Sequence, residues 1–252
     1  MQVLRTYAIE KCRGYSWSDQ GEFTVWASYL NAIKQARQYI YIEDQYFYTF
    51  GHPPAIEAPK GNLRDSDPVF QLGEALKRGV DVVVLVPSRS EDFGARYQLH
   101  QRGKAAHYLY SIADSSPHPV GRFVICFLRV GSKDPVVHSK LMIVDDEFVL
   151  IGSANVGQRR MSYDSEIQLG IVDSAHLLAR NLRLALWKEH MELSDTNDIS
   201  EDFEGVSNFR DNAISESGHL RIFSTADPGS APLCHRFMMN YVIDPYKGPK
   251  RS

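Results

Sequence analysis

Cysteines are scarce in this chain, and long apolar runs are absent. The 252 residues include three cysteines, Cys12, Cys126 and Cys234, which are too few and too far apart for a disulfide framework or a zinc site. No stretch is long enough to span a bilayer, and the first residues, MQVLRTYAIEKCRG, lack the apolar run of a signal peptide. We therefore expect a cytoplasmic or peripheral membrane protein, and the sequence leaves the compartment otherwise open.

An excess of basic charge is also missing. The formal net charge is −3 at pH 7 and the pI is near 6.3, so the chain as a whole has no bulk attraction to nucleic acid or to an anionic membrane. Nucleic acid is therefore not favoured as a partner. The apolar content of 43% supplies enough residues for a core and argues against general disorder.

Helical and strand patterns alternate along the chain. Strand patterns cover residues 39–43, 80–86, 122–130 and 165–172, and helical patterns cover 22–38, 68–79, 91–112 and 174–191, with a loop at 51–67. This order predicts an α/β fold in which helices flank both faces of a mixed sheet. From residue 194 the sequence becomes acidic and weakly periodic. We therefore expect a domain over 1–193 and a loop-rich extension, 194–252, packed on it.

The segment 136–166, VVHSKLMIVDDEFVLIGSANVGQRRMSYDSE, concentrates the residues that can do chemistry. His138 and Lys140 are two positions apart, so on a strand their side chains project from the same face. An imidazole can make or break a bond to phosphorus, and a neighbouring ammonium can neutralise the phosphate oxygens. Asp145 and Asp146 lie between two apolar stretches and predict a hairpin turn.

Three polar side chains are candidates for holding the phosphate. Ser153 and Asn155 lie in a Gly-Ser-Ala-Asn stretch whose small residues let the backbone approach a ligand, and a helix starting near Ser153 would add its positive end. The alternative is that both residues cap that helix, and we favour phosphate contact. Gln45 follows a buried strand and is the third candidate, whereas Glu43 and Asp44 are expected to hold loops.

Two carboxylates and two arginines complete the candidates. Glu166, near the start of the last strand pattern, is placed to accept the Nδ1 proton of His138 and fix its tautomer; the alternative is an exposed acid at a strand edge. For Asp145 we favour a structural role, because a turn carboxylate commonly binds backbone amides. Arg159 and Arg160 are candidates either for contacting a head group or for surface salt bridges.

The pattern HSKLMIVDDEFVLIGSAN, with MSYDSEI after it, resembles the HKD signature of the phospholipase D superfamily. IYIEDQYF at 40–47 and VLRTY at 3–7 resemble segments of the C-terminal half of two-motif members. The resemblance covers about residues 3–190 and implies one half of a pseudo-twofold pair. It also implies catalytic roles for His138, Lys140, Asp145 and Glu166 and phosphate binding by Lys140, Ser153, Asn155 and Gln45, with no metal and no cofactor.

Members with two motifs bring both to one active site, and this chain contains one. None of its eight other histidines has a lysine two positions later. The resemblance therefore implies a second HKD half as partner, from the same longer chain or from a homodimer, and a phospholipid substrate at a membrane surface. One histidine would form a phosphohistidine while the other protonates the leaving alcohol. The alternatives are a nuclease, a cardiolipin synthase-like phosphatidyltransferase, or an inactive half-domain.

Overall fold

One mixed sheet organises the molecule. The computed structural model describes residues 1–7, 21–50, 63–89, 95–114, 121–200 and 202–223. Within them the sheet has the strand order β2-β1-β8-β7-β6-β3-β4-β5-β9. The strands are β1 (Gln2–Tyr7), β2 (Glu22–Phe23), β3 (Tyr39–Asp44), β4 (Asp81–Leu85), β5 (Phe123–Leu128), β6 (Lys140–Val144), β7 (Phe148–Gly152), β8 (Glu166–Val172) and β9 (Leu220–Ile222). Strands β3, β4 and β5 run parallel, and the other pairs are antiparallel.

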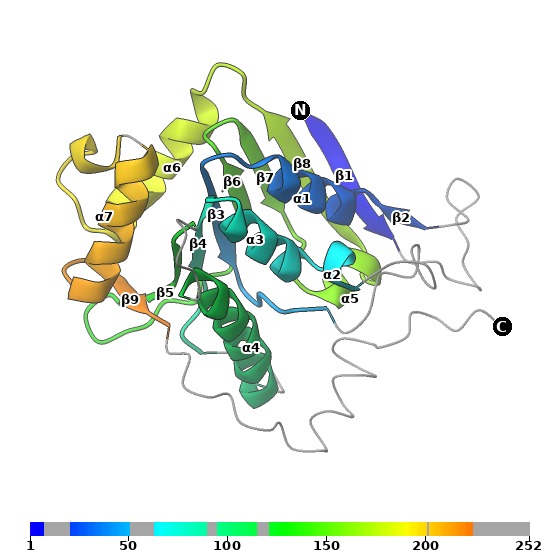
Figure 1. Ribbon diagram of the computed structural model, residues 1–252, viewed down its shortest axis with the longest axis horizontal. Helices are drawn as coiled ribbons and strands as arrows, with labels where there is room; N and C mark the ends of the chain where they lie inside the picture. The colour runs from blue at the N-terminus through cyan, green and yellow to red at the C-terminus, as the bar shows by residue number, and fades with distance from the viewer. Residues whose placement is uncertain (8–20, 51–62, 90–94, 115–120, 201, 224–252) are drawn as a thin grey trace.

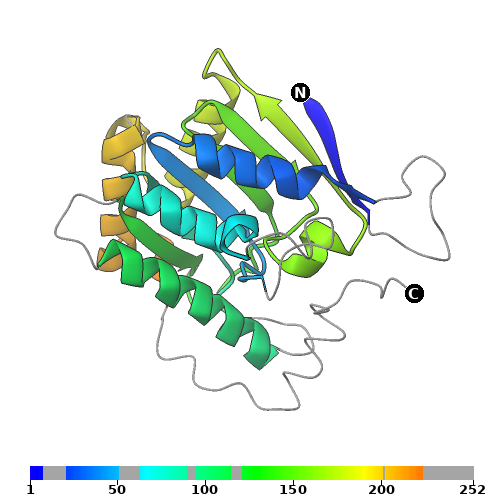
Figure 2. The same ribbon diagram turned by 45° about the vertical axis from the view of Figure 1, so that its right-hand side comes forward.

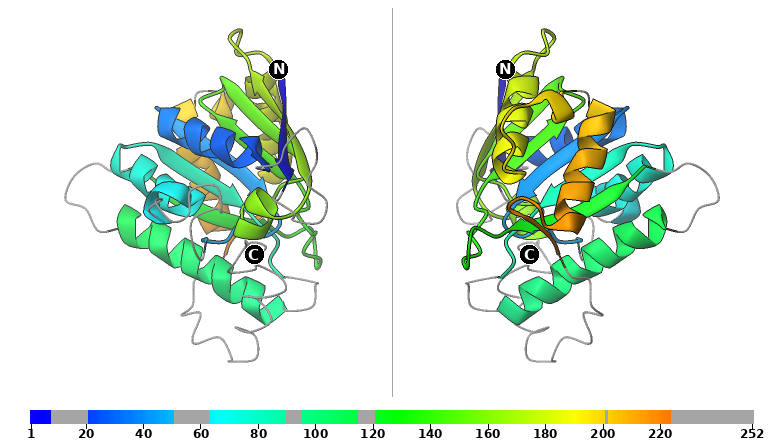
Figure 3. Two further views of the ribbon diagram at one scale, coloured as in Figure 1. Left: turned by 90° about the vertical axis from the view of Figure 1, so that its right-hand side faces the viewer. Right: turned by 90° about the vertical axis from the view of Figure 1, so that its left-hand side faces the viewer.

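Helices cover both faces, which confirms the predicted α/β class. The helices are α1 (Thr24–Gln35), α2 (Leu63–Ser66), α3 (Pro68–Lys77), α4 (Ala95–Ala113), α5 (Gln158–Ser162), α6 (Leu178–His190) and α7 (Asp202–Ser215), with a 3-10 turn at Asn197–Ile199. Helices α1, α3 and α4 lie on one face, and α6 and α7 lie on the other (Figures 1 and 2). Figure 3 shows the two layers from the sides. None of the described helices is long and apolar enough to cross a membrane.

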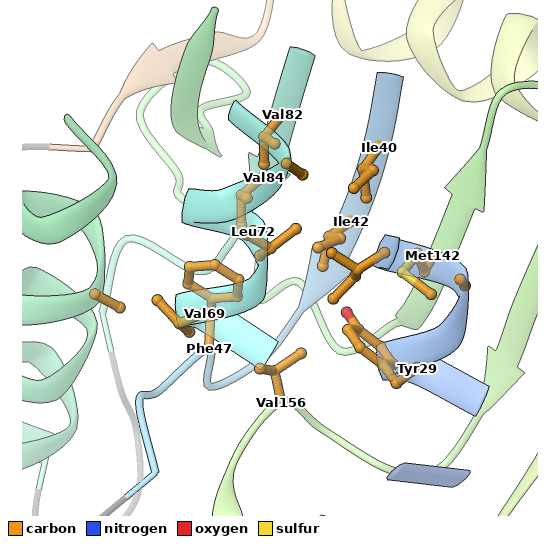
Figure 4. Close-up of a cluster of buried hydrophobic side chains, with 14 of the residues drawn as sticks. Tyr29, Ile40, Ile42, Phe47, Val69, Leu72, Val82, Val84, Met142 and Val156 are labelled. Atoms are coloured by element: carbon orange, nitrogen blue, oxygen red, sulfur yellow. The ribbon is translucent and has the colours of Figure 1, made fainter. Parts of the chain in front are cut away.

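Alternation along the central strands builds two cores. Ile40 and Ile42 of β3 point towards α1 and α3, where they meet Val84, Leu72 and Met142 (Figure 4). Tyr39 and Tyr41, at the intervening positions, point towards α6 and α7. Because both faces of β3 and β4 are covered, these strands are apolar at nearly every position.

Most predicted elements are present, and three differ in position or kind. Residues 22–23 pair with β1 as strand β2, so the helix predicted from residue 22 begins at Thr24. The helix predicted from 174 begins at Leu178. Residues 51–62 of the predicted loop lie outside the described residues, and its last part forms α2. Asp67 caps α3 as predicted, because its side chain accepts the N–H of Val69 at 2.8 Å.

The described part of the expected extension contributes regular structure. Helix α7 places Val206 and Phe209 in the core beneath α6, and β9 pairs with β5 at the edge of the sheet. Two apolar anchors one helical turn apart therefore give α7 a buried stripe. Residues 202–223 continue the sheet and its covering layer rather than forming a loop-rich segment. Residues 224–252 lie outside the described part of the chain.

Candidate active site

Four strands bring the candidate residues to one edge of the sheet, here called the catalytic edge. Strand β6 starts at Lys140, which pairs with Asp44 at the end of β3. Strand β7 ends at Gly152, beside the start of β8 at Glu166. Gly152 is required there, because a Cβ would lie 2.2 Å from the carbonyl oxygen of Ile167. The close approach of β7 and β8 therefore depends on a residue without a side chain.

Lys140 lies at the centre of the catalytic edge and is 7% exposed. Its Nζ donates to Gln45 Oε1 at 3.1 Å and to the carbonyl oxygen of His138 at 2.6 Å. An ammonium has three N–H groups, so one is left by these two contacts for a ligand oxygen. Burial lowers the pKa of Lys140, while the carboxylates of Asp44 and Glu166 act in the opposite direction.

His138 precedes β6 and is exposed. The strand predicted through it begins two residues later, so shared strand geometry does not align its side chain with that of Lys140. The hydrogen bond from Lys140 to its carbonyl oxygen still ties the two residues together. The exposed imidazole is open to a substrate that approaches from solvent.

Glu166 contacts Ser153 rather than His138. Its Oε2 accepts the Ser153 hydroxyl at 2.5 Å, and its Oε1 lies 3.8 Å from Arg160 Nε. Among the described residues, no hydrogen bond or ion pair joins Glu166 to the ring of His138. Burial raises the pKa of Glu166, whereas the Ser153 hydrogen bond and Arg160 act to lower it. Glu166 therefore adds negative charge beside Lys140, and the tautomer of His138 is not set by it in this structure.

The helix expected near Ser153 begins five residues later, at Gln158. Ser153 instead extends the pairing of β7 with β8, since its N–H donates to the Ile167 carbonyl at 2.9 Å. Asn155 accepts the N–H of Gln45 at 3.2 Å. Neither residue caps a helix, so the capping interpretation is wrong. Ser153, Asn155, Gln45 and Lys140 all lie at the catalytic edge.

Asp145 is separated from the other candidates. It lies at the far end of β6 from Lys140, in the predicted turn, where Asp145 and Asp146 have φ angles of 52° and 53°. Its carboxylate accepts three backbone N–H groups, from Arg37, Gln38 and Tyr39, at 2.8 to 2.9 Å. This is the structural role favoured from the sequence. Asp145 is five positions after Lys140 along the strand direction, roughly 16 Å away, which leaves it no contact with a substrate at the catalytic edge.

Asp44 holds the loops of the catalytic edge, as expected. Its two carboxylate oxygens accept the N–H groups of Tyr46, Phe47 and Val156 at 2.7 to 2.8 Å. Burial raises its pKa to about 6, more than these hydrogen bonds lower it. Asp44 thus joins the segment after β3 to the segment after β7 and places a carboxylate near Lys140.

Asp44→Asn is expected to lower the pKa of Lys140 further, because the variant removes a carboxylate that favours the ammonium. The new amide oxygen can still accept from Tyr46 and Phe47, so the loop keeps two of its three contacts. NMR titration of the Lys140 side chain measures the pKa directly. Asp65→Asn, at an exposed position on α2, is the control. An unchanged or higher pKa in Asp44→Asn would contradict this account of the charge at the site.

A second cluster lies behind the catalytic edge, on the α6 face, and sequence reasoning missed it. Ser139 donates its hydroxyl to Glu43 Oε2, and Tyr41 donates to Glu43 Oε1 at 2.7 Å. His190 of α6 lies 3.2 Å from the same oxygen. Burial acts to raise the pKa of Glu43, but these hydrogen bonds outweigh it and leave the pKa below its ordinary value. Glu43 thus fixes the residue between His138 and Lys140.

Arg102 was also missed, and no local signal marks it. Its guanidinium is fully buried on α4 and donates to the carbonyl oxygens of Gln45, Pro87 and Tyr46 at 2.6 to 3.1 Å. Arg102 therefore fixes the chain that carries Gln45.

The two arginines that the sequence offered as head-group contacts form salt bridges. Arg159 and Arg160 contact the carboxylate of Asp164 at 2.8 and 2.5 Å. No group of three or more His, Cys, Asp or Glu side chains in the described ranges could hold a metal ion.

Two family models match long stretches of the chain. A family model described as "Cardiolipin synthase, PLD-like domain" matches residues 29–183, more than half of the chain, and one described as "Phospholipase D" matches residues 132–244. The chain belongs to the phospholipase D superfamily.

Similar superfamily proteins are much longer than this chain. Phospholipase D alpha 1 of Ricinus communis is 41% identical over 233 residues, which cover 70% of this chain and 29% of that protein. Phospholipase D alpha 3 of Arabidopsis thaliana is 26% identical over 245 residues, covering 69% of this chain and 28% of that protein. The chain thus spans less than a third of these two relatives.

Solved structures of the superfamily fold are also similar. Nuc from Salmonella typhimurium, a phospholipase D family member, is 21% identical with a TM-score of 0.45, covering 76% of this chain and 93% of that chain. The phosphatidylserine synthase of Haemophilus influenzae Rd KW20 is 11% identical with a TM-score of 0.48, covering 95% of this chain and 44% of that chain.

Proposed function

We propose that this chain supplies one half of a phospholipase D-type active site that cleaves the head-group phosphodiester of glycerophospholipids. The observation that carries the proposal is the placement of Lys140, whose ammonium is held by Gln45 and by the carbonyl oxygen of the exposed His138. The two relatives described above are named phospholipase D, which supports this reaction class.

The proposed reaction has two steps and uses two histidines. The Nε2 of one histidine attacks phosphorus, and the bond from phosphorus to the head-group oxygen breaks as the other histidine donates its proton to that oxygen. The second histidine then takes a proton from water or another alcohol, whose oxygen attacks phosphorus and displaces the first histidine. The products are the free head-group alcohol and either phosphatidic acid or a new phosphatidyl alcohol. His138 supplies one of the two imidazoles.

Lys140 would act on the phosphoryl oxygens in both steps. Negative charge grows on these oxygens as phosphorus becomes five-coordinate, and a fixed ammonium stabilises that charge without reorganisation. Ser153 and Asn155 are proposed to bind the phosphate from the adjoining loop, and Gln45 to keep the ammonium in place. Asp145 supports the fold of the strand. No cofactor or metal ion is part of the proposed mechanism.

The second histidine is proposed to come from a partner half that docks beside the catalytic edge. Val3, Ile151 and Ile167 are 52%, 41% and 55% exposed, and with Leu169 they form an apolar strip across β1, β8 and β7. These residues alternate with others that face α1, so the strip lies on the opposite face of the sheet, on strands whose side chains α6 and α7 leave exposed. An exposed apolar strip next to half of an active site suits a partner that completes the site.

The test measures turnover and association together. The purified chain is incubated with phosphatidylcholine vesicles and ethanol, alone and mixed with the complementary N-terminal half of Ricinus communis phospholipase D alpha 1. We expect phosphatidylethanol either from the chain alone, at a rate second order in protein, or only from the mixture. The first result indicates a homodimer and the second a missing half. No product in either arm contradicts the proposal and favours an inactive half-domain.

Two additions sharpen this experiment. Ile167→Asp places a charge in the apolar strip and is expected to abolish association and turnover together, whereas Val172→Asp, at the other end of β8 and 73% exposed, preserves both. Parallel reactions with phosphatidylglycerol as acceptor and with DNA as substrate test the cardiolipin synthase-like and nuclease alternatives. Faster turnover in either of them would replace the phospholipase D assignment.

A further inference from the structure

A large hollow opens beside the catalytic edge, where strands β4 and β5 end. Its volume is about 820 Å³, and it is lined by residues 87–89, Arg129 and residues 131–136. None of the residues assigned to the reaction lines it. The hollow is therefore a separate cavity, large enough for a polar lipid head group.

The hollow carries excess positive charge in a chain whose formal net charge is −3. Arg89, Arg129 and Lys133 line it, and Asp134 is its one carboxylate. Arg129 contacts Asp134 at 2.8 Å, so that pair is neutral in sum and the lining keeps two further cations. Arg89 and Lys133 are both exposed. Two cations facing one hollow attract a group with more than one negative charge.

The wall that carries Lys133 is held firmly. Val130 and Lys133 pair through two backbone hydrogen bonds of 2.8 and 3.1 Å, across a turn in which Gly131 has a φ of 60°. A tight turn with a glycine in the left-handed region fixes the chain on either side of it. Lys133 and Arg129 are therefore presented from a closed hairpin at the rim of the hollow.

The hollow and the catalytic edge adjoin. Val136 lines the hollow, and His138 follows two residues later. Two residues of extended chain span about 7 Å, and β6 and β5 are separated in the sheet only by β3 and β4. The hollow therefore lies next to the segment of chain that carries His138.

We propose that this hollow binds a second phosphate group, next to the one proposed to react, with Arg89 and Lys133 as its main contacts. The most fitting carrier is an anionic phospholipid in the same membrane surface as the substrate. This inference depends on the proposed function in one respect: that function supplies the reacting phosphodiester next to the second phosphate. The binding itself needs neither turnover nor a partner half.

The test uses the full chain with His138→Ala, so that no lipid is consumed. Binding is measured by co-sedimentation with phosphatidylcholine vesicles that contain or lack 10 mole per cent phosphatidic acid, and by NMR titration with inorganic phosphate. We expect the Arg89→Ala/Lys133→Ala variant to bind the anionic vesicles roughly 30-fold more weakly, since each basic residue near an anionic surface contributes about a factor of five. Lys34→Ala/Lys104→Ala, with the same change in charge on exposed positions of α1 and α4, is the control and is expected to bind normally.

The two arms identify the source of the phosphate. Binding to anionic vesicles that is lost in the variant assigns the hollow to a lipid head group. Resonances of residues 131–136 that shift with inorganic phosphate, without vesicle binding, assign it to free phosphate. The proposal is overturned if Arg89→Ala/Lys133→Ala keeps both vesicle binding and the phosphate-induced shifts. It is also overturned if Lys34→Ala/Lys104→Ala loses binding to the same extent. Because no turnover is measured, this failure leaves the proposed function untouched.

Discussion

Replacing Arg183 with methionine is expected to lower the free energy of unfolding by about 3–5 kcal/mol, because it leaves the buried carboxylate of Asp146 without its positively charged partner. Arg183 is fully buried on α6, and its guanidinium makes a bidentate contact with Asp146 at 2.9 and 2.6 Å. It also donates to the carbonyl oxygen of Ile199 at 2.7 Å. One side chain therefore joins α6 to the β6–β7 turn and to the 3-10 turn after α6.

Thermal and urea unfolding measure this effect, with a melting temperature expected to fall by roughly 6–20 °C. Lys188→Met, at a partly exposed position on the same helix, is the control and is expected to stay within about 0.5 kcal/mol of the parent. A double variant, Arg183→Met with Asp146→Asn, is expected to recover part of the loss because no buried charge remains. A single variant that loses less than about 1 kcal/mol would show that Asp146 does not depend on Arg183.

Replacing His138 with alanine is expected to lower turnover of the completed enzyme by about 10²–10⁴-fold, the usual range for loss of a proton-transfer residue. The fold is expected to survive, because His138 is exposed and precedes β6. A change in melting temperature of less than about 2 °C separates lost chemistry from lost structure. His107→Ala, at an exposed position on α4, is the matched control and is expected to keep full turnover.

The leaving group distinguishes two roles for His138. Choline needs a proton as it departs, whereas nitrophenolate leaves without one. If His138 is the general acid, the loss in His138→Ala is expected to be much smaller with a nitrophenyl phosphodiester than with phosphatidylcholine. If His138 is the nucleophile, both substrates lose turnover equally. Full activity of the variant on phosphatidylcholine would remove His138 from the mechanism.

Short-range patterns predicted the strands and the turn that carry the candidate site. The alternation of apolar residues around Asp145 and Asp146 indicated two strands and a turn, and the structure contains β6, β7 and that turn. The register then follows from the pleat, so Lys140 and Asp44 meet at one edge. The preference of turn carboxylates for backbone amides also predicted the contacts of Asp145.

Side-chain partners were much harder to predict. Glu166 was expected to bind His138 and instead accepts from Ser153, because adjacent strand ends bring those two side chains together at 2.5 Å. The contact between Glu43 and His190 joins residues 147 positions apart in the sequence. Arg102, on helix α4, donates to three carbonyl groups in the loops that follow β3 and β4. A local pattern specifies which face a side chain occupies. It does not specify which of several polar groups on that face it will meet.

The position of β1 bears on how the chain is synthesised. Strand β1 is an interior strand whose main partner is β8, and Thr6 pairs with Glu166, 160 residues later. At about 5–20 residues per second on the ribosome, β1 emerges roughly 8–32 s before the strand that pairs with it. Contacts so distant in sequence form slowly. The nascent chain therefore exposes the side of β1 that later pairs with β8 during that interval, and a chaperone that shields residues 2–7 is expected to raise the yield of folded protein.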